Sequence, residues 1–258
     1  MKKIITVALV IIISTIANAQ TIPAATNAWL AKEKKYCKVT AKDYSTTPAS
    51  NDLDFSNVLL NQNKADIVVG FIGNNKQRIQ MLITGVKKDY TKKGVYQVQG
   101  KSYVKGNLCE FNGFIIMAGI FKAKPLAYAD GTPKEMGLLT AAYYFNEDAS
   151  QKSTGHFEGV CLHKWIITQD DDLKSNDYEA DADGFYNNQF VGFWESYKTK
   201  VKKPCNWGEY RIPLCGDLDQ GAGQFEPAPK YLPFGWQDYL DKRNETENKA
   251  RTKEWWED

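Results

Sequence analysis

The stretch GVYQVQGKSYV (94–104), the turn KGN (105–107) and the run LCEFNGFIIMAGIF (108–121) decide the expected fold. In the first stretch apolar and polar side chains alternate, and a period of two is typical of a half-buried β-strand. The turn is polar and contains glycine. A parallel crossover needs about a dozen residues or more, so this short turn favours two antiparallel neighbours.

Similar strand-like runs, separated by polar turns, occur through most of the chain. Further strands are expected at 66–72, 77–86, 138–145, 156–168, 189–199 and 207–212. Several of them are separated by polar turns. Glycines inside these runs favour bends, which a sheet needs in order to curl. We therefore expect a mainly β protein, an antiparallel meander of about eight strands forming a barrel-like domain, with a two-sheet sandwich as the alternative.

The chain divides into four parts by composition. Residues 1–19 are expected to be a signal peptide, 20–64 an N-terminal helix and loop, 65–236 the antiparallel β domain, and 237–258 a charged tail. The helix should contain Trp29, which could cover strands that are apolar on both faces.

The first segment has the three parts of a secretory signal. Lys2 and Lys3 precede a short apolar run, and Ala17-Asn18-Ala19 forms a small-x-small cleavage site before Gln20. The run is shorter than the roughly 20 residues that span a bilayer. We expect a periplasmic or secreted protein without a transmembrane segment in the mature chain.

The charge balance excludes other classes. The 258 residues include 33 Lys and Arg against 31 Asp and Glu, with 43% hydrophobic residues. Cleavage would remove two lysines and leave a neutral chain. A neutral chain exerts no general attraction on phosphate backbones, so no nucleic-acid partner is expected.

Five cysteines remain in the mature chain, at positions 37, 109, 161, 205 and 215. An exported protein can form disulfides, and Cys205 and Cys215 flank a short segment that a bridge could close. We expect that bridge and leave the pairing of the other three open. Zinc is not expected because no Cys-x-x-Cys motif is present.

An acidic loop lies between two expected strands. Glu179, Asp181 and Asp183, followed by Gly184, resemble half of a calcium loop, in which alternating oxygen atoms surround the ion. The residue at the twelfth position is Phe190, where an EF-hand has a glutamate. A solvated acidic hairpin is the simpler interpretation, with calcium as the one cofactor considered.

Aromatic residues are the most suggestive excess: 7 Trp, 14 Tyr and 12 Phe. They concentrate toward the C-terminal third. Exposed aromatic side chains bind sugars and flat apolar ligands and anchor interfaces. The candidate binding residues are Tyr186, Trp194, Tyr197, Trp207 and Tyr210.

No catalytic residue is assigned. His156 and His163 are seven apart on one expected strand, so they should face opposite sides of it. Hydrolase signatures such as Gly-x-Ser-x-Gly are absent from the sequence. A pair of carboxylates could still support hydrolysis, with Glu158, Glu195 and Glu209 as candidates.

Two resemblances accompany these patterns. NNQFVGFWESYK (187–198) and CNWGEYRIP (205–213) resemble a segment of uncharacterised secreted bacterial β-rich proteins, which implies export but no activity. The strand pattern is similar in outline to lipocalin-like barrels, which implies one interior and one small ligand. Lipocalins carry Gly-x-Trp on their first strand, whereas residues 192–194 lie on the seventh expected strand here.

We therefore expect an exported protein that binds a small apolar ligand, a glycan or a protein partner. A binding protein fits the sequence better than an enzyme does. The alternatives are a carboxylate-based hydrolase of envelope polymers and a protein-interaction or inhibitor module.

Overall fold

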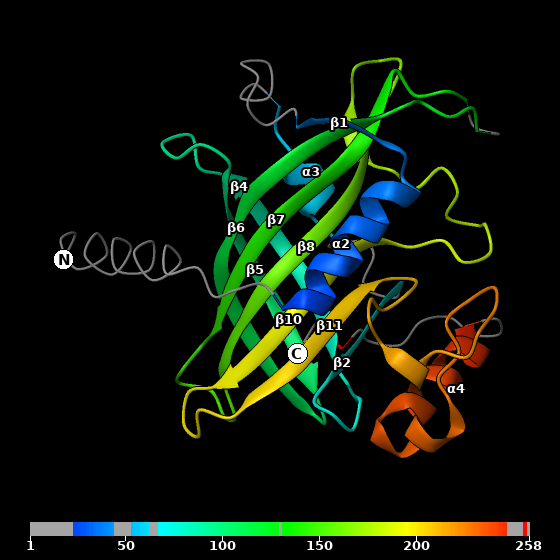
Figure 1. The fold of residues 1–258 in the computed structure, drawn as a ribbon. Coiled ribbons are helices and arrows are strands. Elements are labelled where there is room, and N and C mark those ends of the chain that lie inside the picture. The colour runs from blue at the N-terminus through cyan, green and yellow to red at the C-terminus, as the bar shows by residue number, and fades with distance from the viewer. Residues whose placement is uncertain (1–22, 44–52, 62–66, 129–130, 247–254, 257–258) are drawn as a thin grey trace.

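The computed structural model describes residues 23–43, 53–61, 67–128, 131–246 and 255–256 (Figure 1). The expected signal peptide, residues 1–19, lies outside the described residues, as do residues 247–254 and 257–258 of the expected charged tail.

The described chain is mainly β, as expected. Its strands are β1 (Val39–Asp43), β2 (Val68–Ile72), β3 (Gln77–Arg78), β4 (Gln80–Lys88), β5 (Val95–Val104), β6 (Asn107–Ala123), β7 (Glu135–Glu147), β8 (Gly155–Ile167), β9 (Leu173–Ser175), β10 (Asn187–Ser196) and β11 (Lys202–Glu209). The helices are α2 (Ala24–Tyr36), α3 (Ser56–Leu59), the 3₁₀ turns η4 (Gly216–Leu218) and η5 (Pro229–Phe234), and α4 (Trp236–Thr246).

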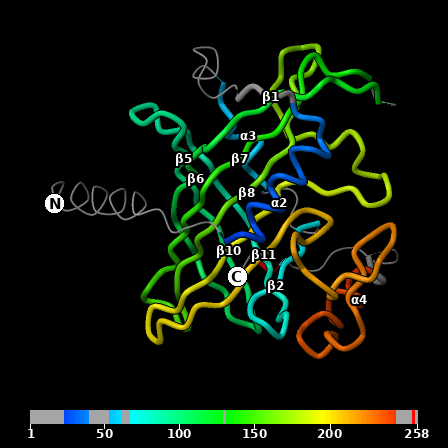
Figure 2. The backbone as a smooth tube through the Cα atoms, in the orientation of Figure 1, coloured from blue at the N-terminus to red at the C-terminus, as the bar shows by residue number. Residues whose placement is uncertain are grey.

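The strands form one antiparallel sheet in the order β3-β2-β11-β10-β8-β7-β6-β5-β4, and the short strands β1 and β9 pair with β6 and β8. Only Ile79 separates β3 from β4, and its N–H donates to the Gly70 carbonyl of β2 (3.0 Å). The two end strands of the sheet, β3 and β4, are therefore joined through Ile79. The sheet curls into a barrel-like form (Figures 1 and 2). This confirms the expected antiparallel meander and favours the barrel over the sandwich.

Side chains from alternate positions of the strands fill the inside of the curl. The largest fully buried ones include Trp165, Trp207 and Tyr96. The paired glycines Gly159 and Gly192 give Tyr143 room to enter, because a Cβ on Gly192 would lie 2.5 Å from the Tyr143 hydroxyl. Glycine inside these strands therefore serves close packing across the interior.

Helix α2 covers the outer face of the sheet, as the position of Trp29 suggests. Trp29 packs on Leu138, Leu162 and Val191, which belong to β7, β8 and β10. The helix lies across these strands in Figure 1. The strands that are apolar on both faces are therefore buried on both.

The C-terminal segment after β11 forms a second, smaller core outside the sheet (Figure 1). Val69 and Phe71, on the outer face of β2, pack with Phe225 and Trp236. The expected tail began at residue 237, but α4 starts at Trp236 and its Tyr239 also contacts this core. The first part of the expected tail therefore forms helix α4 and packs on this outer core.

Strand β11 begins earlier than its apolar pattern predicts. It starts at Lys202, whereas the strand was expected at 207–212, and Lys202 pairs with Glu195 in the β10–β11 ladder. The Lys202 ammonium also contacts the Glu158 carboxylate (2.5 Å) on the same outer face. Cross-strand charge pairs of this kind support a strand end that lacks apolar residues.

Candidate functional site

The inside of the barrel-like sheet is packed with aromatic rings. Phe190 stacks on Trp207 at 4.6 Å between ring centres, and Tyr143 meets both rings edge-on. Trp207 is only 1% exposed. A small ligand would have to displace these rings, so the packed interior offers no site for one.

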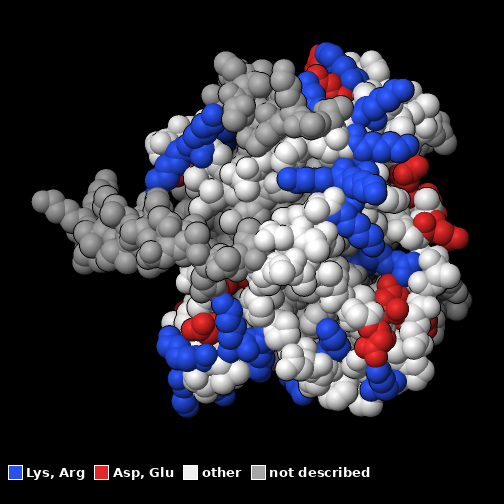
Figure 3. Space-filling view, viewed as in Figure 1, with Lys and Arg blue, Asp and Glu red and all other residues white. Residues whose placement is uncertain are grey.

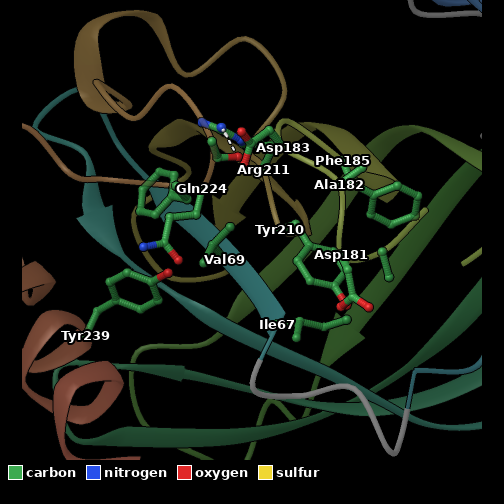
Figure 4. A pocket seen from close by; sticks show the side chains of 13 residues that line it. Ile67, Val69, Asp181, Ala182, Asp183, Phe185, Tyr210, Arg211, Gln224 and Tyr239 are labelled. Atoms are coloured by element: carbon green, nitrogen blue, oxygen red, sulfur yellow. Dashed lines mark hydrogen bonds between the residues drawn. The ribbon is translucent and has the colours of Figure 1, made fainter. Parts of the chain in front are cut away.

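A cavity of about 550 Å³ lies on the outside, between β2 and the C-terminal segment. Its floor is Ile67 and Val69, and Figure 4 shows the other side chains around it. The walls are the loop 180–185, the residues after β11, the loop 223–225 and Tyr239 of α4. Two of these loops are joined by the Gly184 N–H, which donates to the Gly223 carbonyl (2.7 Å).

Tyr210 has a backbone conformation that bulky residues rarely adopt. Its φ is +62°, in the left-handed region, and its N–H donates to the Ile67 carbonyl (2.8 Å). The ring packs edge-on against Phe185, with 5.3 Å between ring centres. Such a conformation costs about 1–3 kcal/mol and persists where the surroundings hold it. Here it places a phenol ring in the wall of the cavity.

Arg211 holds the loop 221–223, which lies next to the acidic loop of the cavity. Its guanidinium donates to the Asp219 carboxylate (2.6 Å) and to the carbonyls of Gly221, Ala222 and Gly223 (2.9, 2.9 and 2.6 Å). The charge and the donors of this arginine are therefore already engaged. Its side chain is 14% exposed. It therefore fixes the shape of the cavity wall and has little surface left to contact a ligand.

The far wall is a second aromatic group. Tyr239 meets Phe225 edge-on at 5.5 Å, and the guanidinium of Arg78 lies 5.4 Å from the centre of the Tyr239 ring. Burial lowers the pKa of Arg78 to about 10. Burial also raises the pKa of the Tyr239 hydroxyl. The two aromatic groups thus stand on opposite sides of the cavity, as Figure 4 shows.

Two of the three candidate calcium ligands reach the cavity. Asp181 and Asp183 line it, whereas Glu179 does not. Burial raises the pKa of the Tyr210 hydroxyl, and the negative charges of Glu209 and Asp181 raise it further. Across the described residues no group of three or more His, Cys, Asp or Glu side chains is placed to hold a metal ion. Calcium stays a prediction.

The five candidate aromatic residues do not form one surface. Trp194 and Trp207 face the interior, and Trp194 Nε1 donates to Glu147 (2.9 Å). The Tyr197 hydroxyl donates to Asn146 (3.2 Å) near the β7–β8 turn. The Tyr186 hydroxyl donates to Glu33 of α2 (2.5 Å).

Only Tyr210 of the five lines the cavity. Phe185, Phe225 and Tyr239 complete its aromatic walls, and none of the three was among the candidates. Their signal in the sequence was the aromatic density of the C-terminal third. That density alone does not separate core residues from cavity residues.

The expected Cys205–Cys215 disulfide is wrong. All five cysteines of the chain lie within the described residues and are free thiols. Cys205 is fully buried in the interior, whereas Cys215 packs in the outer C-terminal core. The wall of the sheet stands between them, which the length of the intervening segment did not reveal.

His163 lies at the centre of a buried polar chain inside the sheet, and His156 faces outward. His163 Nδ1 lies 2.7 Å from Asn188 Oδ1, and the Asn188 amide donates to Glu209 (2.7 Å). Burial lowers the pKa of His163 to about 4. The imidazole is therefore neutral near pH 7, and we assign it a structural role.

Charge divides between the two ends of the sheet. The acidic loop precedes β10 and a basic turn with lysines at 198, 200, 202 and 203 follows it, so the two lie at opposite ends of this strand. Figure 3 shows one group of basic side chains at the lower left, where the β10–β11 turn lies, and others across the upper right of this face. The acidic loop is the one that borders the cavity.

No family model, curated protein or solved structure matches this chain. Among the described residues, no helix has the length and apolar character needed to cross a lipid bilayer. The functional argument therefore rests on the geometry of the site.

Proposed function

We propose that this is an exported, non-enzymatic binding protein that takes a small organic ligand in the outer cavity. The volume of about 550 Å³ falls in the range of small-molecule sites, which are mostly apolar with a few polar groups. Aromatic rings on two sides and the floor of Ile67 and Val69 supply the apolar surface, and polar groups make up about half of the lining. Export is supported by residues 1–19 of the sequence.

The observation that carries the proposal is the cavity with aromatic rings on two sides. Phe185 and Tyr210 meet edge-on at 5.3 Å in one wall, and Tyr239 lines the other. Tyr210 is one of nine non-glycine residues with a positive φ among the described residues, and of these nine it alone lines the cavity. Aromatic side chains around an open volume are typical contacts for a small ligand.

The alternatives have less geometric support. Of the three strand carboxylates considered for hydrolysis, Glu209 is 1% exposed inside the sheet. Glu158 contacts Lys202 on the outer face, where the neighbouring Glu195 pairs with Lys202 in the ladder. For the interaction module, the apolar outer face of β7, β8 and β10 already carries α2.

Binding can be tested with thermal unfolding of the purified protein against a library of glycans, amines and small aromatic compounds. A ligand at about 100 times its Kd adds about 2.7 kcal/mol to the free energy of unfolding. For a domain of this size that corresponds to a Tm rise of about 5–10 °C.

Three variants give the test its controls. Tyr210→Gly removes the ring and relieves the backbone strain, so the protein should fold and lose the ligand-induced shift. Tyr210→Phe should keep most of it. Tyr90→Ala removes an aromatic residue that is 80% exposed and outside the cavity, and should leave the shift unchanged. A hit that Tyr210→Gly still binds fully, or a library without hits, would overturn the proposal.

A further inference from the structure

We infer that the ligand of the outer cavity carries a positive charge, as a primary or quaternary ammonium group beside a small apolar body. This inference rests on the proposed function and specifies its ligand class. It comes from the arrangement of two rings, two carboxylates and one neutralised arginine around the cavity.

The rings of Phe185 and Tyr210 form a corner suited to a cation. Their centres are 5.3 Å apart and their planes cross at 80°, so they form two nearly perpendicular walls. The face of an aromatic ring is electron-rich, and quaternary ammonium groups are commonly bound between such rings. A cation in this corner could contact both rings at once.

Asp181 adds negative charge at this corner, and Asp183 adds it farther along the wall. Both are exposed and line the cavity; Figure 4 shows Asp181 beside Tyr210 and Asp183 beside Arg211. Among the described residues, no lysine or arginine lies within ion-pair distance of either carboxylate. Their charge is thus available to a ligand.

The basic groups near the cavity already have partners. Arg211 binds Asp219 and three carbonyls, and Arg243 binds Glu226 (2.7 Å). Arg78 lies over Tyr239 on the opposite wall. The ammonium of Lys164 donates to the Tyr186 carbonyl (2.9 Å) and lies 5.7 Å from the centre of the Phe185 ring, so one cation of the protein already reaches this ring. Asp181 gives the Tyr210 side of the corner its negative charge.

The rest of the cavity suits an uncharged body. Ile67 and Val69 form an apolar floor that leads from this corner toward Tyr239. Gln224 supplies an amide that can donate or accept a hydrogen bond. A compact amine with a hydroxyl group has the matching chemistry.

The test uses matched pairs of cationic and neutral probes, with affinity measured by titration calorimetry or chemical-shift changes. Choline is compared with 3,3-dimethylbutan-1-ol, which replaces the nitrogen by carbon, and glucosamine with glucose. We expect the cation of at least one pair to bind about tenfold or more tightly than its neutral partner. Raising the salt concentration should weaken the cation only.

Two variants locate the effect. Asp181→Asn with Asp183→Asn keeps the shape of both side chains and should lower the affinity for the cation about fivefold, with no change for the neutral probe. Asp171→Asn is the control, because Asp171 lies in the β8–β9 turn, where it pairs with Lys134, outside the cavity lining. It should change neither affinity.

The outcomes separate the two claims. If the neutral member of each pair binds as tightly as the cation, or if only neutral library compounds bind, the inference on charge is overturned while the binding function stands. If no cation binds and the library gives no hit, both fall. If a cation binds but the double Asn variant retains full affinity, the site assigned to the charge is wrong.

Discussion

The inside of the sheet and the outer cavity are built from the same kinds of residues, yet they differ in what surrounds the rings. Inside, Phe190 and Trp207 stack at 4.6 Å between strands that are hydrogen-bonded along their length. In the cavity, Phe185 and Tyr210 stand on loops and leave open volume between them and Tyr239. The comparison teaches that aromatic residues fill space where the backbone is regular and leave space where loops hold them apart.

The largest expected effect is on the interior. Trp207→Ala removes a fully enclosed ring, and large-to-small substitutions of this type cost about 3–5 kcal/mol. Urea unfolding should show this loss in the free energy of unfolding. A loss below about 1 kcal/mol would mean that the interior is loosely packed, and the contrast with the cavity would disappear.

A buried carboxylate at one end of the sheet gives the next effect. Glu147 accepts hydrogen bonds from Ser102 (2.5 Å), Gly155 (2.8 Å) and Trp194 (2.9 Å). Glu147→Ala should cost about 3 kcal/mol because three donors lose their acceptor. Glu147→Gln keeps the acceptors for Gly155 and Trp194 and can donate to Ser102, so it should be neutral or stabilising.

The same residue predicts a pH dependence with a defined sign. Burial raises the pKa of Glu147 above its unfolded value of 4.5. Its contribution to stability is therefore fully present below that value and is lost as the pH rises through the folded pKa. Glu147→Gln should flatten this part of the unfolding profile; an unchanged profile would contradict the assignment.

His163 should give the opposite pH dependence. Its pKa falls from 6.5 to about 4 on folding, so its contribution is present above pH 6.5 and is lost as the pH falls toward 4. At about 1.4 kcal/mol per pKa unit, the loss is about 3 kcal/mol. Chemical unfolding between pH 7 and 4 tests this. His163→Gln should reduce the slope; His156→Gln, on the outer face, should change it much less.

The smallest effect on stability is expected in the cavity. Tyr210→Gly relieves the strain at φ +62° but loses the packing of the ring on Phe185. We expect the two terms to cancel within about 1 kcal/mol, whereas Tyr210→Ala keeps the strain and should be less stable than the glycine variant. If glycine is the more destabilising of the two, the strain argument fails.

Much of the fold could be predicted because it depends on local signals. Alternation in 94–104 and the three-residue turn after it define β5, its connection and β6. The position of the Trp29 helix on the outer face of the sheet could be predicted, because strands that are apolar on both faces need a second layer to bury them. In contrast, β9 and the wall built on Trp236 and Tyr239 have no periodic signal, because their positions depend on contacts with distant segments.

The candidate site was predicted only in part. Tyr210, Asp181 and Asp183 were selected for their chemistry and do line the cavity. Trp207 and Trp194 were selected with the same reasoning and lie inside. Strand β10 is apolar on both faces, so its pattern does not reveal which face is interior.

The sequence by itself determined the antiparallel meander, since a period of two and short polar turns act between neighbours in the chain. It also determined the charge balance and the expected leader. Only the tertiary structure decided which rings pack and which line a cavity, and which side of the wall each cysteine occupies. Those outcomes depend on the direction in which the sheet curls and on contacts such as Gly184 with Gly223, which join segments that no local pattern connects.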